Sequence, residues 1–208
     1  MLTGVVSNSI YLNGGVQGYF HDWYYSMDDE RNAHIKFINF LKNDFLTFTS
    51  LVPSSERKLT QVLVEDLREI VAVHGQLTVC GIPRSKREGT YPASKMGLKR
   101  GIRAAVVQVA GLEDGLDYIV RYKDTCTTHW ARYNRGGEGP MPYPGITWDT
   151  CRISTEVAGK DVLLIDDIYT PNCGIDEDAI QTLLDAGANS VIFYAIGYTA
   201  RKSCRNCA

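Results

Sequence analysis

Hydrophobic and polar positions along the chain change their period after residue 75. Before it, apolar residues recur at helical spacing in two stretches, which predict helices over residues 28–48 and 54–74. An aromatic-rich, β-prone segment comes first and turns at the sequence NGG, residues 13–15, a typical hairpin signal. After residue 75, short apolar runs alternate with helical segments. This alternation is typical of a parallel α/β sheet.

The predicted elements define a fold class. The expected strands and helices of the second region cover residues 76–82, 94–110, 117–122, 161–168, 176–186 and 190–196. We therefore predict an α/β fold with a central, mostly parallel sheet flanked by helices, and an N-terminal hairpin and helical extension. The expected organisation is an appendage of residues 1–74, packed on a core of residues 75–208.

Composition is ordinary for a globular protein. A chain of 208 residues, 44% hydrophobic and 22% charged, suits one domain or a core with an appendage. No apolar run approaches the roughly 20 residues needed to span a membrane, and the N-terminus has no signal-peptide pattern. Six cysteines in such a chain indicate reduced thiols. We expect a cytoplasmic protein without membrane association.

Charge is balanced overall but not locally. The net charge is −2, yet residues 84–103 hold seven of the 22 Lys and Arg residues and one acid. Such a stretch can attract phosphate groups or form a solvated helix face. It lacks the interleaved aromatics that stack single-stranded bases. We do not expect a nucleic-acid partner, although the stretch leaves that interpretation open.

Two adjacent carboxylates, Asp166 and Asp167, follow the apolar run VLLI at the end of an expected strand. Ligands of parallel α/β sheets bind at the carboxyl ends of strands. Two ionised carboxylates side by side need water, cations or hydroxyl donors, and the vicinal hydroxyls of a ribose would meet this need. The N-terminus of the following helix could supply N–H groups to an anion.

Two other families place acids after an apolar strand. A P-loop NTPase needs the pattern G-x-x-x-x-G-K-[ST], and the Gly-Lys pair in VAGKDVLL has no Ser or Thr after it. A response-regulator receiver needs a phosphoacceptor Asp about two strands later, and one predicted strand follows here. Neither pattern is met.

The motif VLLIDDIYT, followed by a helix that ends in AGA, resembles the motif with which type I phosphoribosyltransferases bind phosphoribosyl pyrophosphate (PRPP). VCGIPRSK resembles the strand and pyrophosphate loop of that family, and YIVRYKDTCTTHWAR the start of its flexible catalytic loop. The similarity covers roughly residues 75–200 and is closest to the ComF competence proteins and the amidophosphoribosyltransferase-like branch.

The resemblance implies the type I phosphoribosyltransferase fold and a transfer of ribose 5-phosphate from PRPP, with Mg²⁺, to a nitrogen acceptor. Asp166 and Asp167 would bind the ribose hydroxyls and reach Mg²⁺ indirectly. The implied catalytic residues are Asp166, Asp167, Arg121 and Lys123; the pyrophosphate-binding residues are Arg84, Ser85 and Lys86; the ribose and 5′-phosphate loop adds Tyr169, Thr170, Asn172, Cys173 and Gly174.

The phosphate loop departs from the family pattern T-T-G-x-T. Pro171 removes an N–H donor, Asn172 replaces a glycine, and Gly174 stands where a hydroxyl residue is expected. Three acids at 176–178 follow, which as exposed first-turn residues would stabilise the helix end but repel a phosphate.

Two alternatives therefore stay open. The protein could be a non-catalytic nucleotide-sensing or ribose-sensing protein, or a partner-binding one. It could also be an effector acting on another ribose ligand, such as NAD or a nucleoside. A homodimer or a protein partner also remains open. The pair Cys204 and Cys207 is half of a zinc site, and a frayed tail is the simpler interpretation.

Overall fold

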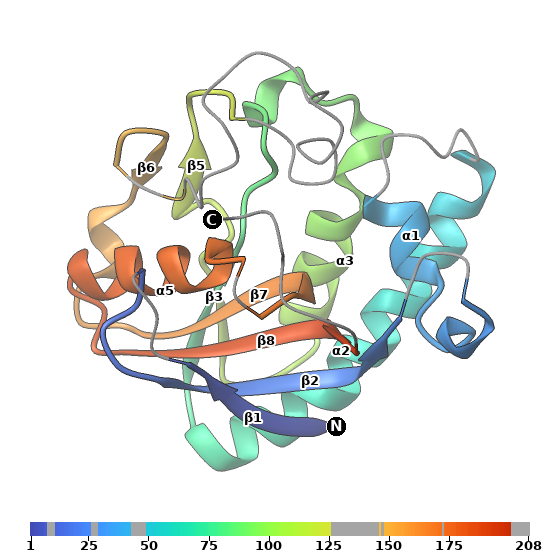
Figure 1. Ribbon diagram of the computed structural model, residues 1–208, viewed down its shortest axis with the longest axis horizontal. Helices are drawn as coiled ribbons and strands as arrows, with labels where there is room; N and C mark the ends of the chain where they lie inside the picture. The colour runs from blue at the N-terminus through green and yellow to red at the C-terminus, as the bar shows by residue number, and fades with distance from the viewer. Residues whose placement is uncertain are drawn as a thin grey trace.

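A six-stranded sheet runs through the centre of the computed structural model, with helices on both faces (Figure 1). The structure describes residues 1–7, 11–25, 29–42, 49–125, 146, 148–171 and 173–200. The strands, in their order across the sheet, are β1 (Leu2–Val6), β2 (Val16–Tyr24), β8 (Ser190–Thr199), β7 (Asp161–Tyr169), β3 (Leu77–Gly81) and β4 (Leu112–Asp114).

Five of these strands are parallel. β2 pairs with β8, β8 with β7, β7 with β3, and β3 with β4, all in parallel register. β1 pairs antiparallel with β2, so an N-terminal hairpin is present, but its first strand is Leu2–Val6 and not the run directly before residues 13–15. The predicted α/β class with a mostly parallel central sheet is therefore confirmed. The first 74 residues do not stand apart from it, because they supply two strands of the same sheet.

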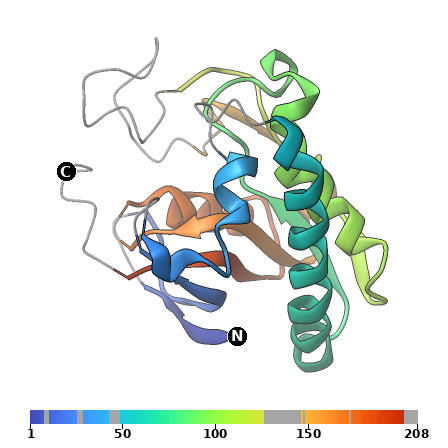
Figure 2. The same ribbon diagram turned by 90° about the vertical axis from the view of Figure 1, so that its right-hand side faces the viewer.

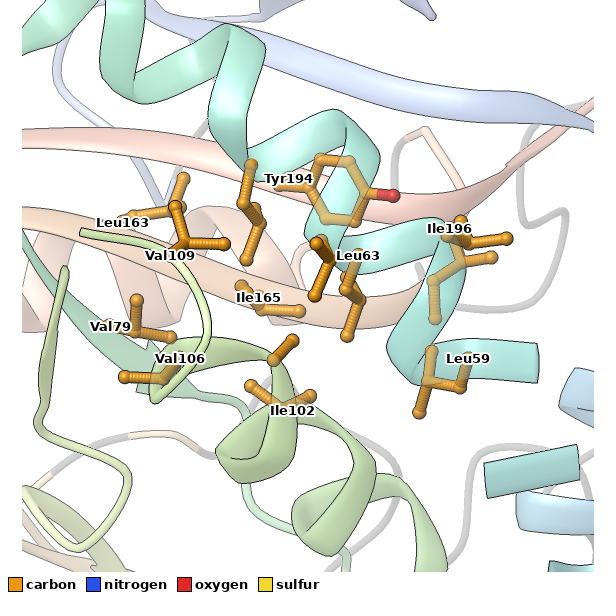
Figure 3. Packing of buried hydrophobic residues seen from close by; sticks show 14 of the residues in the cluster. Leu59, Leu63, Val79, Ile102, Val106, Val109, Leu163, Ile165, Tyr194 and Ile196 are labelled. Carbon is orange, nitrogen blue, oxygen red and sulfur yellow. The ribbon is translucent and has the colours of Figure 1, made fainter. Parts of the chain in front are cut away.

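Helices cover the two faces of the sheet unequally. α2 (Val52–His74) and α3 (Gly97–Val106) pack on one face, and α5 (Ile175–Asp185) lies on the other (Figures 1 and 2). The larger core lies under α2 and α3, where Leu63 of α2 and Ile102 of α3 face Ile165 of β7 (Figure 3). Gly187 ends the region of α5 with φ 93°, the left-handed cap expected there.

α2 and α3 approach each other closely at Gly101. A methyl group added there would lie 2.5 Å from Cδ2 of the fully buried Leu59. A glycine is therefore required by packing at this helix crossing.

The larger core contains a buried carboxylate that has hydrogen-bond partners. Asp66 of α2 is buried, and its Oδ2 accepts a hydrogen bond from the Tyr194 hydroxyl at 2.7 Å. Nδ1 of His21 on β2 lies 2.8 Å from the same oxygen. The three residues tie α2 to neighbouring strands β2 and β8, because a buried carboxylate needs such partners.

The structure corrects the helix expected over residues 28–48 for residues 29–42, and the rest of that range lies outside the described residues. The chain forms a 3₁₀ turn at Glu30–Asn32 and the short helix α1 at Phe37–Lys42. Asn32 is fully buried, and its Oδ1 accepts a hydrogen bond from the backbone N–H of Tyr25. This non-local bond holds the segment in a turn, which helical spacing alone does not reveal.

The fold also contains a separate two-stranded sheet and several 3₁₀ turns. β5 (Ile119–Arg121) pairs antiparallel with β6 (Cys151–Ile153) in a separate two-stranded sheet. Additional 3₁₀ turns are Thr49–Leu51, Glu88–Thr90, Ala93–Met96 and Thr155–Val157. β4 and β6, at three residues each, were not predicted from the sequence. Across the described ranges, no helix is long and apolar enough to cross a membrane.

The topology marks one place for a ligand. From β3 the chain passes through α3 to β4 on one side, whereas β7 lies on the other side of β3 and continues into α5 on the opposite face. The strand order thus reverses between β3 and β7. In open parallel sheets, ligands bind outside the carboxyl ends of the strands at such a point.

Candidate ligand site at the ends of β3 and β7

The loop after β3 and the end of β7 lie side by side at this reversal point. The backbone N–H of Ile82, one residue beyond β3, donates a hydrogen bond to the Ile165 carbonyl at 3.0 Å. The sequence then presents Arg84, Ser85 and Lys86 on one side and Asp166 on the other. The proposed pyrophosphate loop therefore follows β3, and the proposed ribose acids lie near the carboxyl end of the adjacent strand β7.

Arg121, at the end of β5, joins this loop to α5. It is 4% exposed, and its Nε donates to the Arg84 carbonyl at 2.6 Å. Its charge also acts on Asp178 in the first turn of α5, where it opposes the rise in the pKa of that carboxyl caused by burial. Asp178 in turn accepts a hydrogen bond from the backbone N–H of Ile146. A buried guanidinium thus sits between the two loops of the candidate site.

A second set of contacts fixes the loop after β3. The backbone N–H of Thr125 donates to the Ser85 carbonyl at 2.7 Å, and Lys86 Nζ donates to the Thr125 carbonyl at 2.7 Å. The Arg84 guanidinium lies 4.5 Å from the ring centre of Tyr91, whose hydroxyl accepts from the Lys86 N–H. The loop is held by the segment after β5 and by Tyr91.

Lys123 is placed differently from Arg121. Its side chain is exposed, and its backbone N–H donates to the Thr150 carbonyl. Of the two basic residues that the resemblance assigned to catalysis, Arg121 is built into the site and Lys123 points its charge to solvent.

Asp166 and Asp167 differ in environment. Asp167 is 7% exposed, and its Oδ1 accepts a hydrogen bond from the N–H of Ile168 at 2.6 Å. Asp166 is half-buried. The alternation of side chains shifts phase here, because Ile165 and Ile168, three residues apart, both pack toward the α2–α3 core. The two carboxylates lie inside β7 near its carboxyl end, where the pairing with β8 continues to Tyr169.

Asp176 and Glu177 in the first turn of α5 are buried and Asp178 is half-buried, which corrects the expectation that these acids are exposed. Asp176 is 3% exposed, and its Oδ1 has no hydrogen-bond partner among the described residues. Burial raises the pKa of Asp176 well above its ordinary value, and the charge of Asp166 and a hydrogen bond between the two carboxyls add to this rise. A third acid thus lies against Asp166 and Asp167.

Glu177 turns toward Tyr169. The Tyr169 hydroxyl donates to Glu177 Oε1 at 2.9 Å, in a buried setting, and Oε2 has no partner within the described ranges. Burial raises the pKa of both groups, and the neighbouring Glu177 adds to the rise for Tyr169. The Tyr169 ring stacks on Phe20. Tyr169, expected in the ligand loop, therefore directs its hydroxyl into the protein.

The loop between β7 and α5 is anchored at both ends. Thr170 Oγ1 lies 2.8 Å from Thr199 Oγ1 at the end of β8, and Gly174 adopts φ 78° immediately before α5. Cys173 is buried and disulfide-bonded, whereas Cys80 and Cys151 are free, so its partner lies outside the described residues. The expectation of reduced thiols throughout is wrong at Cys173.

Some sequence-based predictions fall on residues that the structure does not describe, among them residues 126–132 of the segment that resembles a catalytic loop. Asn172 of the phosphate loop lies outside the described residues, as do Cys204 and Cys207.

The basic stretch of residues 84–103 is largely occupied by ion pairs. Lys99 contacts Glu88 and Asp117 at 2.5 and 2.6 Å. Further pairs join Arg87 to Asp124, Arg100 to Glu56, and Arg103 to Asp114 and Asp117. Acids distant in sequence therefore offset much of the local positive charge, as in the solvated-face interpretation.

A comparison with models of known protein families finds no family that matches this chain, and a search among curated proteins finds no relative. Among the described residues, no group of three acidic, histidine or cysteine side chains could hold a metal ion. The site is thus defined by its geometry: two loops from adjacent strands, one cationic and one acidic, joined by Arg121.

Sequence reasoning missed two members of this site. Asp176 was assigned to an exposed helix end, although Ile180 and Leu183 follow it at i+4 and i+7 and are fully buried. That spacing places Asp176 on the apolar face of α5, a signal readable in the sequence. Tyr91, which positions Arg84 and Lys86, is not marked by any such spacing in the sequence.

Proposed function

We propose that this protein binds PRPP with Mg²⁺ at the ends of β3 and β7 and transfers ribose 5-phosphate to a nitrogen acceptor, in a fold of the type I phosphoribosyltransferase kind. The observation that carries the proposal is the pairing of a cationic loop after β3 with Asp166 and Asp167 near the carboxyl end of β7, at the point where the strand order reverses. PRPP has two ribose hydroxyls, which suit the carboxylates, and a diphosphate, which suits the cationic loop.

Each loop suits one part of such a ligand. Carboxylates of Asp166 and Asp167 can accept hydrogen bonds from vicinal hydroxyls. Arg84, Lys86 and Arg121 provide positive charge near the leaving diphosphate, where charge develops as the C1′–O bond breaks. The contacts that fix the loop after β3 reduce the reorganisation needed on binding.

The donor set is compatible with an indirect role for Mg²⁺. Carboxylate oxygens suit this hard cation, which usually retains waters and binds through one or two carboxylates together with substrate phosphates. Asp166 and Asp167 would reach the ion through the ribose, and the ion would neutralise part of the diphosphate charge. The protein side chains supply orientation and electrostatic stabilisation.

A second candidate has one observation in its favour. Asp176 and Glu177 are buried at the helix end where a 5′-phosphate would lie. A nucleoside has no 5′-phosphate and would avoid the repulsion from these acids, and NAD, whose 5′-phosphates are diesters with one negative charge each, would reduce it. The ribose contacts of Asp166 and Asp167 would be the same.

Isothermal titration calorimetry with PRPP and Mg²⁺ tests the first candidate. We expect binding in the micromolar to millimolar range, and pyrophosphate release when a suitable nitrogen acceptor is added from a panel. The double variant Asp166→Asn, Asp167→Asn should lose PRPP binding, whereas Lys58→Gln, an exposed change on α2, should keep it.

Parallel titrations with adenosine and NAD separate the candidates. Binding of these ligands without PRPP binding would favour the second. No binding of PRPP at millimolar concentration would reject the transferase assignment. Unchanged affinity in the double variant would remove Asp166 and Asp167 from the site.

A further inference from the structure

A pocket lies beside the loop after β3, on the side of α3. Its empty space of about 620 Å³ includes open solvent at the mouth, so the pocket is only partly enclosed. Its walls come from that loop, the 3₁₀ turns before α3, α3 itself and β5. We propose that this pocket binds an organic anion with an apolar body.

The interior of the pocket is apolar. Leu98 and Ile102 of α3 face it together with Leu116, Ile119 and Ile165. Ile102 and Ile165 belong to the core between α3 and the sheet (Figure 3), so this wall is backed by packed side chains. An apolar group that entered here would leave water for a preformed apolar surface, which favours binding.

The charged residues that line the pocket are mostly positive. Five of them are Arg or Lys: Arg84, Lys86, Lys95, Lys99 and Arg121. Glu88 is the acid among the lining residues, and it forms an ion pair with Lys99 at 2.5 Å. A negative group on the ligand would therefore meet a field of opposite sign at the pocket wall.

The cationic wall is held in position before any ligand arrives. Arg84 lies over the Tyr91 ring, and its Nη1 donates to the Lys95 carbonyl at 3.3 Å. Tyr91 is itself bonded to the backbone of Lys86. Since these side chains are already ordered, an anion would bind them at a lower entropic cost.

The pocket is adjacent to the proposed ribose site but distinct from it. Ile165 lines the pocket and directly precedes Asp166, whereas neither Asp166 nor Asp167 lines it. The pocket shares Arg84, Lys86 and Arg121 with the proposed pyrophosphate site, and the ribose residues are the part of the proposed site that it does not share. The inference depends on an apolar interior and a positive wall, which together select an amphipathic anion such as an arene carboxylate over a neutral or purely inorganic ligand.

A matched pair of probes tests the charge. Titration of the full chain with 2-naphthoate and with the neutral isostere 2-naphthamide, followed by calorimetry, should give at least about tenfold tighter binding of the acid, because a charge-assisted hydrogen bond is lost with the amide. The preference should shrink as salt is added, since screening weakens exposed ion pairs.

Matched variants test the location. Leu98→Trp fills the apolar interior and should abolish binding of 2-naphthoate, and Lys95→Met should weaken it. Val73→Trp and Lys58→Met make the same changes at exposed positions of α2 and should leave affinity unchanged. Circular dichroism checks that each variant is folded.

Three results would overturn the proposal. They are no binding of 2-naphthoate up to about 10 mM, equal affinities for the acid and the amide, or unchanged affinity in a folded Leu98→Trp variant. The Asp166→Asn, Asp167→Asn variant should bind 2-naphthoate as the unmodified chain does, so failure of the ribose site and failure of this pocket are separate outcomes.

Discussion

Arg121 donates a hydrogen bond from Nε to the main-chain carbonyl of Arg84 at 2.6 Å, although the two residues are 37 positions apart. The bond closes the base of the loop that follows β3. The same guanidinium also lowers the pKa of Asp178 in α5 by its charge, against the rise caused by burial, so one side chain acts on both sides of the candidate site. The stability of the molecule and the geometry of the site therefore share a residue.

Replacing Arg121 should cost stability. Arg121→Met removes a buried donor and leaves the Arg84 carbonyl without it, so we expect a loss of about 1–3 kcal/mol in the free energy of unfolding. Urea denaturation followed by fluorescence measures this loss. Lys123→Met, two residues further on at an exposed position, is the control and should change stability by less than about 0.5 kcal/mol. Equal effects of the two changes would contradict the structural role of Arg121.

Asp176 should make stability depend on pH. Its pKa in the folded state lies above that of the unfolded chain, so the unfolded state releases the proton first as pH rises above about 4. The free energy of unfolding should therefore decrease from that pH upward until the folded carboxyl ionises. Glu177, whose pKa is also raised, acts in the same direction.

Asp176→Asn removes this group and its repulsion from Asp166. We expect the variant to be more stable than the unmodified chain by about 1 kcal/mol or more at pH 8, with a smaller difference near pH 4. Asp185→Asn, an exposed change in the same helix, is the control. Parallel stability curves for the Asp176 variant and the unmodified chain across this pH range would exclude the assignment.

Tyr194→Phe should lower the free energy of unfolding, because Asp66 is a buried carboxylate in the larger core. The Tyr194 hydroxyl donates to the buried Asp66 carboxylate, so its removal leaves that carboxylate with fewer donors. We expect a loss of about 1–3 kcal/mol in urea unfolding. Tyr198→Phe keeps its ring contacts with Phe20 and Trp23 and serves as the matched hydroxyl deletion. If both variants unfold at the same denaturant concentration, the Asp66 contact contributes nothing measurable.

The disulfide at Cys173 can be counted directly. The chain has six cysteines, and one disulfide leaves 6 − 2 = 4 thiols at most. Denatured, unreduced protein should therefore react with four or fewer equivalents of Ellman's reagent, and reduced protein with six. In the folded state, Cys80 should react slowly, because burial raises its pKa to about 12. Six reactive thiols without a reductant would show that Cys173 is reduced.

Elements with strong internal periodicity could be predicted from the sequence. α2, α5, β3, β7 and β8 each present a run of apolar residues at a clear spacing, and the structure confirms them. β4 and β6 could not be predicted, because three residues carry too little pattern. The helix expected over residues 28–48 failed because Asn32 bonds to the backbone of Tyr25, a contact that spacing does not encode.

The candidate site was predictable in part for the same reason. Strand order places the ends of β3 and β7 together once the fold class is known, so Arg84 and Asp166 could be expected near one another. The bond from Arg121 to Arg84 depends on the path of β5 and has no local signature. Asp176 could have been found, since its spacing to Ile180 and Leu183 marks the buried side of α5.

The N-terminal hairpin has a consequence for the long apolar strand beside it. β2 covers the edge of β8 along Gly18 to Tyr24, and β8 carries the run SVIFYAIGYT. A shortened chain that begins after residue 25 would leave this run as an open edge, rich in β-branched and aromatic residues and without a single charge. Such an edge templates intermolecular strand addition. We therefore expect the first 25 residues to reduce self-association. A chain that lacks them should precipitate under conditions in which the full chain stays dissolved.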